Sequence, residues 1–277
     1  MKGVLEFAQA KVQGHKLVMV TAYDYPSAYF AEQAGVDLIL VGDSVGMVVL
    51  GHDSTVPVTM DDMVRHTQAV RRGATDTFIV GDLPFWSTSS VACAVERAGR
   101  LVQEGGCHAV KLEGGRNVAV HVEAIVRAGV PVCGHIGLTP QSATALGGFR
   151  VQGKTAAQAR ALLEDAKSLE AAGAFMVVLE CVPIPLARVI TERLHIPTIG
   201  IGAGPHCDGQ VLVWHDLLGM YPRQAPKFVY RYADLGTLAT KGIATFAEQV
   251  RQGTFPGAEQ GFVMDEEELA RALNPPV

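Results

Sequence analysis

Seven short runs of apolar, largely β-branched residues recur along this chain of 277 residues, with helical patterns between them. A strand that is apolar on both faces must be buried on both faces, which is typical of a parallel sheet covered by helices. The chain therefore alternates strand and helix. The runs are LVMVTAY (17–23), LILVGDS (38–44), FIVGDLP (78–84), AVKLEGG (109–115), PVCGHIG (131–137), FMVVLE (175–180) and PTIGIGAG (197–204).

Three segments between these runs have a clear helical period and end at a glycine. A glycine in that position suits the left-handed conformation that closes many helices. We therefore predict helices that end at Gly73, Gly106 and Gly173. The segments are TMDDMVRHTQAVRRG (59–73), SVACAVERAGRLVQEGG (90–106) and TAAQARALLEDAKSLEAAG (155–173).

Alternating strands and helices leave two architectures, an open doubly wound sheet and a closed (βα)8 barrel. A weaker eighth strand candidate, VLVWHDLLG (211–219), favours closure in a chain a little longer than a typical barrel. No linker rich in Pro, Gly and Ser divides the chain, so we predict one α/β domain, a (βα)8 TIM barrel, over residues 1–277. Residues from roughly 222 to 277 are predicted as a C-terminal helical extension, packed on the barrel or on a neighbouring subunit.

Charge and cysteine content exclude several classes of protein. The chain has 23 basic and 28 acidic residues and no basic block, so neither nucleic acid nor an anionic membrane is an expected partner. Its five cysteines include no CxxC pair, which argues against a disulfide framework and a zinc site. No signal peptide or membrane span is evident. We predict a soluble cytoplasmic protein that acts on small molecules.

One polar side chain stands near the end of each of five predicted strands. Every one follows a preceding glycine within nine residues, so the same unit of glycine, strand and polar group repeats. The carboxyl ends of parallel barrel strands share one face, which is where active sites are built. We therefore expect these five side chains to meet there. They are Asp43, Asp82, Glu113, His135 and Glu180.

Several of these residues also have ordinary structural explanations. Asp43 could cap a helix that begins near Ser44, and Asp82 could anchor a turn. Glu113 could pair with Lys111, two residues back on the same side of the strand. For Asp43, the cap and the ligand are about equally supported by the sequence alone.

The remaining two residues differ in how easily structure explains them. His135 is by default a hydrogen-bonded core histidine. Glu180 follows five apolar residues and has no local partner in the sequence. A carboxylate at the end of so apolar a strand is therefore a candidate for chemistry.

Taken together, four carboxylates at one barrel mouth predict a cation. They would raise one another's pKa unless positive charge lay among them, and one lysine cannot balance four. Oxygen ligands without a histidine pair or a thiolate cluster select a hard cation such as Mg²⁺. A divalent metal chelated by a 2-oxo acid acidifies the adjacent carbon, and a carboxylate outside the metal shell can then act as base.

Two loop segments leave their interpretation open. IGIGAGPHCDG (199–209) fails the dinucleotide fingerprint because Pro205 occupies the place of the third glycine, so a tight turn is favoured. The Gly-, Thr- and Ser-rich segment GLTPQSATALGGFRVQGK (137–154) is either a lid over the barrel mouth or a passive connector.

Eight stretches in order along residues 1 to 262 also carry a family resemblance. They are TAYDYPSA (21–28), LVGDSVGMVVLGHDST (40–55), PVTMDDMVRHTQAV (57–70), VGDLPF (80–85), VKLEGG (110–115), PVCGHIGLTPQS (131–142), LECVP (179–183) and IGIGAG (199–204). The chain resembles the ketopantoate hydroxymethyltransferase family. The resemblance implies a barrel of the phosphoenolpyruvate/pyruvate type, assembly as a homo-oligomer (a decamer) and a Mg²⁺ cofactor.

The resemblance also implies a reaction and a role for each site residue. A hydroxymethyl group would pass from 5,10-methylenetetrahydrofolate to 3-methyl-2-oxobutanoate, giving 2-dehydropantoate for pantothenate and coenzyme A synthesis. Glu180 would be the proton acceptor. The implied metal-associated acids are Asp43, Asp82 and Glu113. The implied substrate-binding residues are Asp43, Ser44, Asp82 and Lys111, with His135 as a pocket histidine.

Two other functions compete with this interpretation. One is a Mg²⁺-dependent 2-oxo acid lyase or mutase on the same barrel, although KLEGG and GLTPQ are not signatures of those enzymes. The other is a catalytically inactive scaffold, which would be expected to lose Glu180 or Lys111. Both residues are present.

Overall fold

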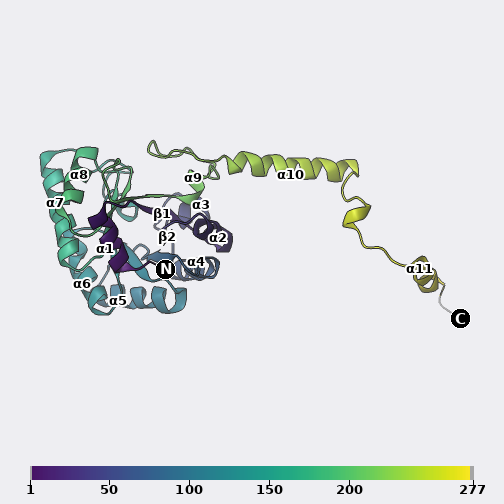
Figure 1. The fold of residues 1–277 in the computed structure, drawn as a ribbon, viewed down its shortest axis with the longest axis horizontal. Helices are drawn as coiled ribbons and strands as arrows, with labels where there is room; N and C mark the ends of the chain where they lie inside the picture. Colours follow the sequence, from purple (N-terminus) through teal and green to yellow (C-terminus); the bar gives the residue numbers. More distant parts are fainter. Residues whose placement is uncertain (1, 275–277) are drawn as a thin grey trace.

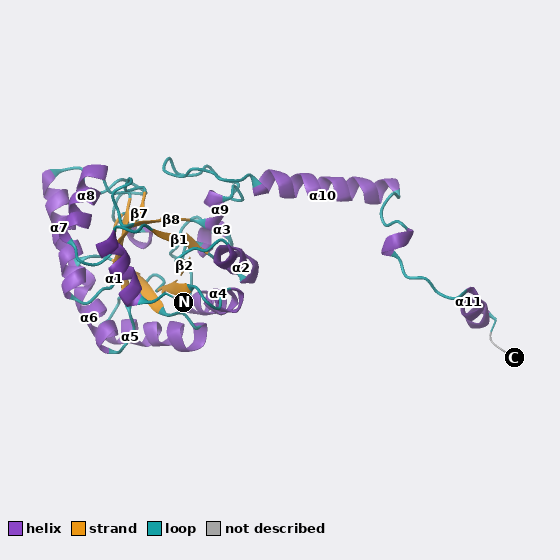
Figure 2. Cartoon of the chain, viewed as in Figure 1, coloured by secondary structure: helices purple, strands orange, loops and turns teal. Residues whose placement is uncertain are grey.

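The computed structural model describes residues 2–274 and shows a closed barrel of eight parallel strands that pair in chain order, as predicted (Figures 1 and 2). Pairing of β1 with β8 closes the barrel. The eighth strand, Gly209–Leu212, begins two residues before the predicted run 211–219 and shares only residues 211 and 212 with it, because the chain forms a short helix from Trp214. The strands are β1 (Leu17–Thr21), β2 (Leu38–Val41), β3 (Phe78–Asp82), β4 (Ala109–Glu113), β5 (Val132–Gly137), β6 (Met176–Glu180), β7 (Thr198–Ile201) and β8 (Gly209–Leu212).

Helices cover the outside of the barrel, as the apolar outer faces of the strands require (Figure 2). The helices up to β8 are α1 (Val4–Gln13), α2 (Tyr25–Gln33), α3 (Val45–Val48), α4 (Met60–Gly73), α5 (Val91–Arg100), α6 (Ala119–Arg127), α7 (Ala156–Ala171) and α8 (Ile184–Arg193). Those after β8 are α9 (Trp214–Leu217), α10 (Leu235–Gln252) and α11 (Glu266–Leu273).

The N-terminal end of the barrel is sealed by α1. Phe7 of this helix is fully buried, and its ring lies 5.2 Å from that of Phe78 and 6.4 Å from that of Phe175. Inward-facing apolar residues of the strands join this cluster and fill the half of the barrel nearest the N-terminal ends of the strands. A ligand can therefore reach the interior only from the C-terminal end.

The inward faces of the strands change from apolar to polar toward that open end. Successive strand residues point to opposite faces, so every second residue looks inward. In β3 the inward residues Phe78 and Val80 belong to the sealed apolar cluster, and the next one is Asp82. In β4 the same alternation runs from Ala109 to Lys111. On these two strands the inward-facing polar residues therefore lie at the mouth.

One predicted helix end has a different cause from the one expected. Gly106 and Gly173 adopt the left-handed conformation, with φ of 82° and 92°. Gly73 does not, and it remains within α4. A Cβ atom at Gly73 would lie 2.3 Å from the carbonyl oxygen of Tyr25, so the residue is small because α2 and α4 pack in close contact there.

The C-terminal extension lies on the barrel only at its start, where residues 224–228 line the mouth, and its helices α10 and α11 do not take the predicted place on the barrel. α10 projects away from the barrel and α11 lies farther out (Figure 1). Neither helix has a buried residue. Packing on a neighbouring subunit stays a prediction, and residues 275–277 lie outside the described residues. Among residues 2–274, no helix has both the length and the apolar character to cross a membrane.

We predict that Gly73→Ala lowers the free energy of unfolding by about 1–3 kcal/mol, because the added methyl group overpacks the contact between α2 and α4. Chemical denaturation followed by circular dichroism measures the change. Gly99→Ala in α5 is the matched control, since nothing lies within 4 Å of its Cβ position. That control should be neutral or stabilise by about 0.5–1 kcal/mol. Equal stability of the two variants would contradict the close contact.

Candidate active site

The register of β3, β4 and β5 places four of the predicted residues side by side. Asp82 is paired with Lys111, and Glu113 with His135. Lys111 Nζ lies 3.1 Å from Oδ1 of Asp82, and both side chains are at most 4% exposed. Glu113 instead contacts His135, with 3.5 Å between Oε1 and Nδ1. The ion pair of Lys111 is thus formed across strands rather than along its own strand.

Asp43 lies directly after β2 and is buried. Its backbone N–H donates to Oδ2 of Asp82 over 3.0 Å, which ties the ends of β2 and β3 together. The residue that caps the following short helix is Ser44, whose side chain makes no capping bond. Asp43 is therefore not a helix cap. Ser44 Oγ instead shares a hydrogen bond of 2.8 Å with the hydroxyl of Tyr23.

Gln141 is a residue of this site that the sequence did not reveal. Its side-chain amide donates to Oδ2 of Asp43 over 2.7 Å and to the carbonyl of Leu83 over 2.9 Å. Its backbone N–H donates to Oε2 of Glu113 over 3.0 Å. Gln141 belongs to the 137–154 segment, so the start of that segment contacts the acids directly. An uncharged side chain in a loop belongs to no periodic pattern that would identify it as a site residue. The only signal in the sequence was the GLTPQ stretch, which is part of the family resemblance.

His135 lies between two carboxylates from neighbouring strands. Besides its contact with Glu113, its Nε2 lies 3.1 Å from Oε2 of Glu180. Burial and the charge of Lys111 oppose protonation of this ring. The contacts with the Glu113 and Glu180 carboxylates outweigh both effects and raise the pKa of His135 to about 9. His135 is therefore a cationic partner that holds Glu180 toward the barrel interior.

The chain turns sharply just after Glu180. Cys181 has a φ of 49°, an uncommon conformation for a residue with a side chain. Its N–H donates to the carbonyl of Ile201 over 2.9 Å, and its carbonyl accepts from Gln152 over 3.0 Å. These two bonds hold the strained turn, which fixes the direction in which β6 presents Glu180.

The carboxylates are not equivalent electrostatically. Burial, together with the charges of Asp82 and Glu113, raises the pKa of Asp43 well above its usual range. Burial also raises the pKa of Asp82, although Lys111 opposes the shift. Burial acts in the same sense on Glu113, but His135 and Lys111 outweigh it and lower that pKa. Negative charge at the mouth is therefore least compensated at Asp43.

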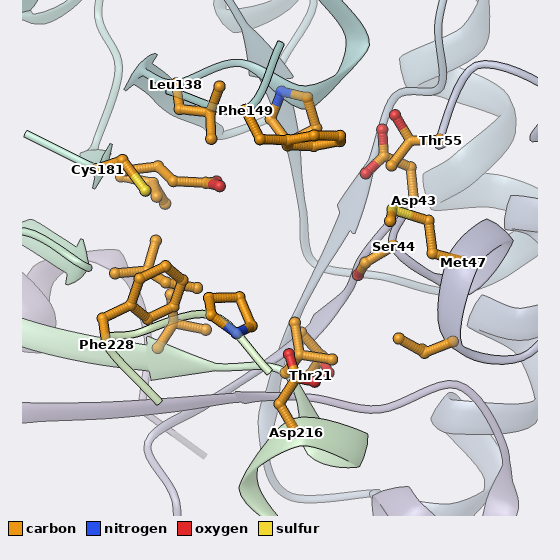
Figure 3. Close-up of a pocket in the computed structure, with 18 of the residues that line it drawn as sticks. Thr21, Asp43, Ser44, Met47, Thr55, Leu138, Phe149, Cys181, Asp216 and Phe228 are labelled. Carbon is orange, nitrogen blue, oxygen red and sulfur yellow. The ribbon is translucent and has the colours of Figure 1, made fainter. Parts of the chain in front are cut away.

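These groups surround a pocket of about 450 Å³ at the C-terminal end of the barrel. Figure 3 shows Asp43, Ser44 and Met47 on one side and Cys181 and Phe228 on the other. Of the seven predicted site residues, five line this pocket: Asp43, Ser44, Asp82, Lys111 and Glu180. Glu113 lines a neighbouring cavity of about 350 Å³, and His135 lies between these groups without lining either cavity. The structure thus gathers all seven into one site.

The donor set fits a hard cation held by few protein ligands. Among residues 2–274, no three Asp, Glu, His or Cys side chains converge as ready-made ligands of one metal ion. Within the same range, Asp82 Oδ1 and Glu113 Oε1 are buried and have ionic contacts with Lys111 and His135 but no well-aligned hydrogen bond. Mg²⁺ usually keeps several waters and takes only one or two carboxylates. The excess negative charge around Asp43 and these incompletely satisfied oxygens suit such an ion.

Comparison with known sequences gives one consistent family. A sequence model described as ketopantoate hydroxymethyltransferase matches residues 2–258. A 3-methyl-2-oxobutanoate hydroxymethyltransferase of Carboxydothermus hydrogenoformans is 56% identical over 269 residues, which cover 97% of this chain and 98% of the relative. The enzyme of the same name from Moorella thermoacetica is 58% identical over 253 residues, or 91% and 94% of the two chains.

Comparison with solved structures supports the fold. A phosphonopyruvate hydrolase crystallised with oxalate and Mg²⁺ aligns with a TM-score of 0.61 at 13% identity, over 99% of this chain and 98% of the other. A 2,3-dimethylmalate lyase of the PEP mutase/isocitrate lyase superfamily aligns with a TM-score of 0.60 at 15% identity, over 98% and 94% of the two chains. At such low identity the likeness shows the shared barrel alone.

We predict that Lys111→Met lowers the free energy of unfolding by about 3–5 kcal/mol, because Asp82 is left as a buried charge without its partner. Denaturant unfolding without added metal measures this loss. The double variant Asp82→Asn/Lys111→Met removes both charges and should recover a clear part of it. If the double variant loses the sum of the two single losses, the ion pair is not what couples these residues.

Proposed function

The chain belongs to the ketopantoate hydroxymethyltransferase family, and we propose that it transfers a hydroxymethyl group from 5,10-methylenetetrahydrofolate to 3-methyl-2-oxobutanoate with the help of Mg²⁺. Water supplies the hydroxyl oxygen, and the products are 2-dehydropantoate and tetrahydrofolate. The product feeds pantothenate and coenzyme A synthesis.

The observation that carries this proposal is the placement of Glu180 in the same pocket as Asp43, Asp82 and Lys111. Proton removal next to a carbonyl requires a base at the carbon and positive charge at the oxygen. Glu180 comes from β6, whereas the lysine and the two aspartates come from β2 to β4. A small 2-oxo acid can therefore place its C3–H toward Glu180 and its oxygens toward the charged cluster.

Asp43, Asp82 and Glu113 are the residues that would hold Mg²⁺. The bound ion would supply positive charge that polarises the 2-oxo group and makes the C3 proton more acidic. Gln141 contacts both Asp43 and Glu113, so it orients the acids before ligands bind.

The remaining residues bind substrate and move the proton. Burial opposes the charge of Lys111, but Asp82, Glu113 and Asp43 outweigh it and raise its pKa, so this residue stays cationic. We assign it and the Ser44 hydroxyl to the substrate carboxylate and the developing enolate charge. Glu180 accepts the C3 proton, and His135 holds Glu180 in place. The carbon that loses the proton then attacks the methylene carbon of the folate.

We further propose that the protein works as a homo-oligomer, a decamer, in the cytoplasm. α10 carries Leu238, Ile243, Phe246 and Val250, which are 47–69% exposed although they are apolar. A face of this kind is covered in solution when another copy of the chain packs on it. All five cysteines are free, which suits a reducing compartment.

Proton NMR tests the proposed function in two steps. With enzyme and Mg²⁺ in D₂O, 3-methyl-2-oxobutanoate should lose its C3–H signal, because enolisation needs no folate. With 5,10-methylenetetrahydrofolate added, 2-dehydropantoate should accumulate. Exchange without product formation would exclude the folate donor, and absence of both would exclude the reaction.

We predict that Asp43→Ala abolishes Mg²⁺-dependent turnover, because it removes the acid at which negative charge is least compensated. Turnover measured over a range of Mg²⁺ concentrations checks this. Asp53→Ala is the control, since Asp53 is exposed and forms an ion pair with Arg223 on the surface. Near-normal activity of Asp43→Ala at ordinary Mg²⁺ would refute the assignment.

We predict that Glu180→Gln lowers both product formation and folate-independent C3 exchange by about 10²- to 10⁴-fold, because the amide keeps the shape but cannot accept a proton. Calorimetric binding of Mg²⁺ and of the 2-oxo acid should persist. Glu192→Gln on the surface of α8 controls for loss of a charge. Collapse of Mg²⁺ binding would make Glu180 a ligand, and exchange at the wild-type rate would place the base elsewhere.

A further inference from the structure

A second group of polar side chains lines the same pocket away from the metal-associated acids. Asp216 of α9 and Tyr221 just after it both belong to the pocket wall, together with Thr21 at the end of β1. Figure 3 shows Thr21 and Asp216 on the side opposite Leu138 and Phe149. None of the functions assigned above uses these residues.

This group is held firmly on the barrel. The backbone N–H of Trp214 donates to Oγ1 of Thr21 over 2.9 Å, which fixes the start of α9 to the end of β1. The N–H of Met220 donates to the carbonyl of His215 over 2.8 Å and folds the chain back after the helix. Asp216 therefore keeps its place at the pocket without help from its own side chain.

The Asp216 carboxylate has no hydrogen bond or ion pair with any of residues 2–274. Its Oδ1 is shielded from solvent without a partner, and so is the hydroxyl of Tyr221. Arg231 attracts the carboxylate weakly, but burial dominates and raises the pKa of Asp216. Buried polar atoms in native proteins nearly always have partners. Because Asp216 is half-buried in the pocket wall, a ligand in the pocket is the natural source of the donor that its shielded oxygen lacks.

The proposed donor offers a complementary group. The pterin ring of a folate presents its 2-amino group and its N3–H on one edge, as two parallel donors. A carboxylate accepts such a pair with both oxygens, and hydrogen bonds to a charged acceptor are about twice as strong as neutral ones. The flat faces of the ring suit the apolar part of the wall, to which Phe228 contributes.

We propose that Asp216 binds the aminopyrimidinone edge of the pterin and so selects the folate donor, with Tyr221 as a second polar contact. This inference rests on the proposed function, because only a folate brings a pterin to the pocket. It divides the site between two substrates. The 2-oxo acid lies between Glu180 and the cluster of Asp43 and Lys111. The pterin lies next to α9.

The test compares binding of tetrahydrofolate to wild type and Asp216→Asn, by calorimetry with the full-length protein. The amide keeps the size of the side chain but turns one acceptor into a donor that faces the pterin N–H groups. Affinity should fall about ten- to a hundredfold. C3 exchange of 3-methyl-2-oxobutanoate with Mg²⁺ should stay at the wild-type rate, because it needs no folate. That exchange also proves that the variant is folded.

A ligand lacking the 2-amino group makes the test specific. In wild type, 2-desamino-tetrahydrofolate should bind more weakly than tetrahydrofolate, and in Asp216→Asn the two ligands should differ much less. Such coupling identifies contact between the two groups, whereas a merely structural residue gives additive losses. Tyr221→Phe should weaken tetrahydrofolate binding and also leave exchange intact. Asp53→Asn, at an exposed carboxylate, should change nothing.

The failures can be told apart. If wild type does not bind tetrahydrofolate, the proposed donor is wrong and the inference fails with it. If wild type and Asp216→Asn bind tetrahydrofolate equally well, only the inference is wrong. The same holds if removing the 2-amino group lowers the affinity by the same factor in both proteins. A parallel fall of exchange and affinity in Asp216→Asn would also overturn it, because the residue would then be supporting the barrel.

Discussion

The parallel register of β3, β4 and β5 is the constraint on which the site depends. It sets Asp82 beside Lys111 and Glu113 beside His135, and strand alternation turns these side chains inward. A shift of one residue in any of these strands would place its polar groups on the outer, apolar face. The sealed cluster around Phe7 therefore does more than stabilise the fold, since it fixes the register that assembles the mouth.

The charge balance at the mouth follows from that register. Lys111 and His135 are the cationic partners, and each lies next to more than one carboxylate. Two such groups cannot compensate the acids held in this buried site. Burial and the charges of Asp82 and Glu113 therefore raise the pKa of Asp43. Binding of a cation would relieve this repulsion. If every acid already had a cationic partner, a metal ion would gain little by binding, so the incomplete pairing is what suits this cluster to a metal.

Sequence patterns predicted the barrel and the convergence of its polar residues, because both follow from strand alternation and from the common face of parallel strands. They did not predict which groups pair. The partner of Lys111 and the contact between His135 and Glu180 depend on register, which a single sequence does not specify. Gln141 and Asp216 escaped for another reason. Gln141 lies on a loop, where no period distinguishes a pocket residue from a surface one. Asp216 lies in the run 211–219, which was expected to be a strand but forms α9 over Trp214–Leu217.

The placement of α10 shows the same limit from another direction. The helical period of α10 can be recognised in the sequence. The pattern of an amphipathic helix does not specify which surface its apolar face covers. In the structure α10 projects away from its own barrel (Figure 1). The helical pattern allowed α10 to pack either on its own barrel or on a neighbouring subunit. In the structure α10 does not pack on its own barrel.

The pocket combines a rigid floor with walls made by loops, and this division bears on how one barrel serves different reactions. The acids, Lys111 and Glu180 stand on or directly after strands, so their geometry is set by the barrel itself. Phe149 belongs to the 137–154 segment, and Asp216 and Phe228 follow β8. Structures that share the barrel at 13–15% identity include a hydrolase and a lyase with other substrates. One barrel can therefore serve different reactions while its strands keep the same architecture, because the loops that complete the wall vary independently of the strands.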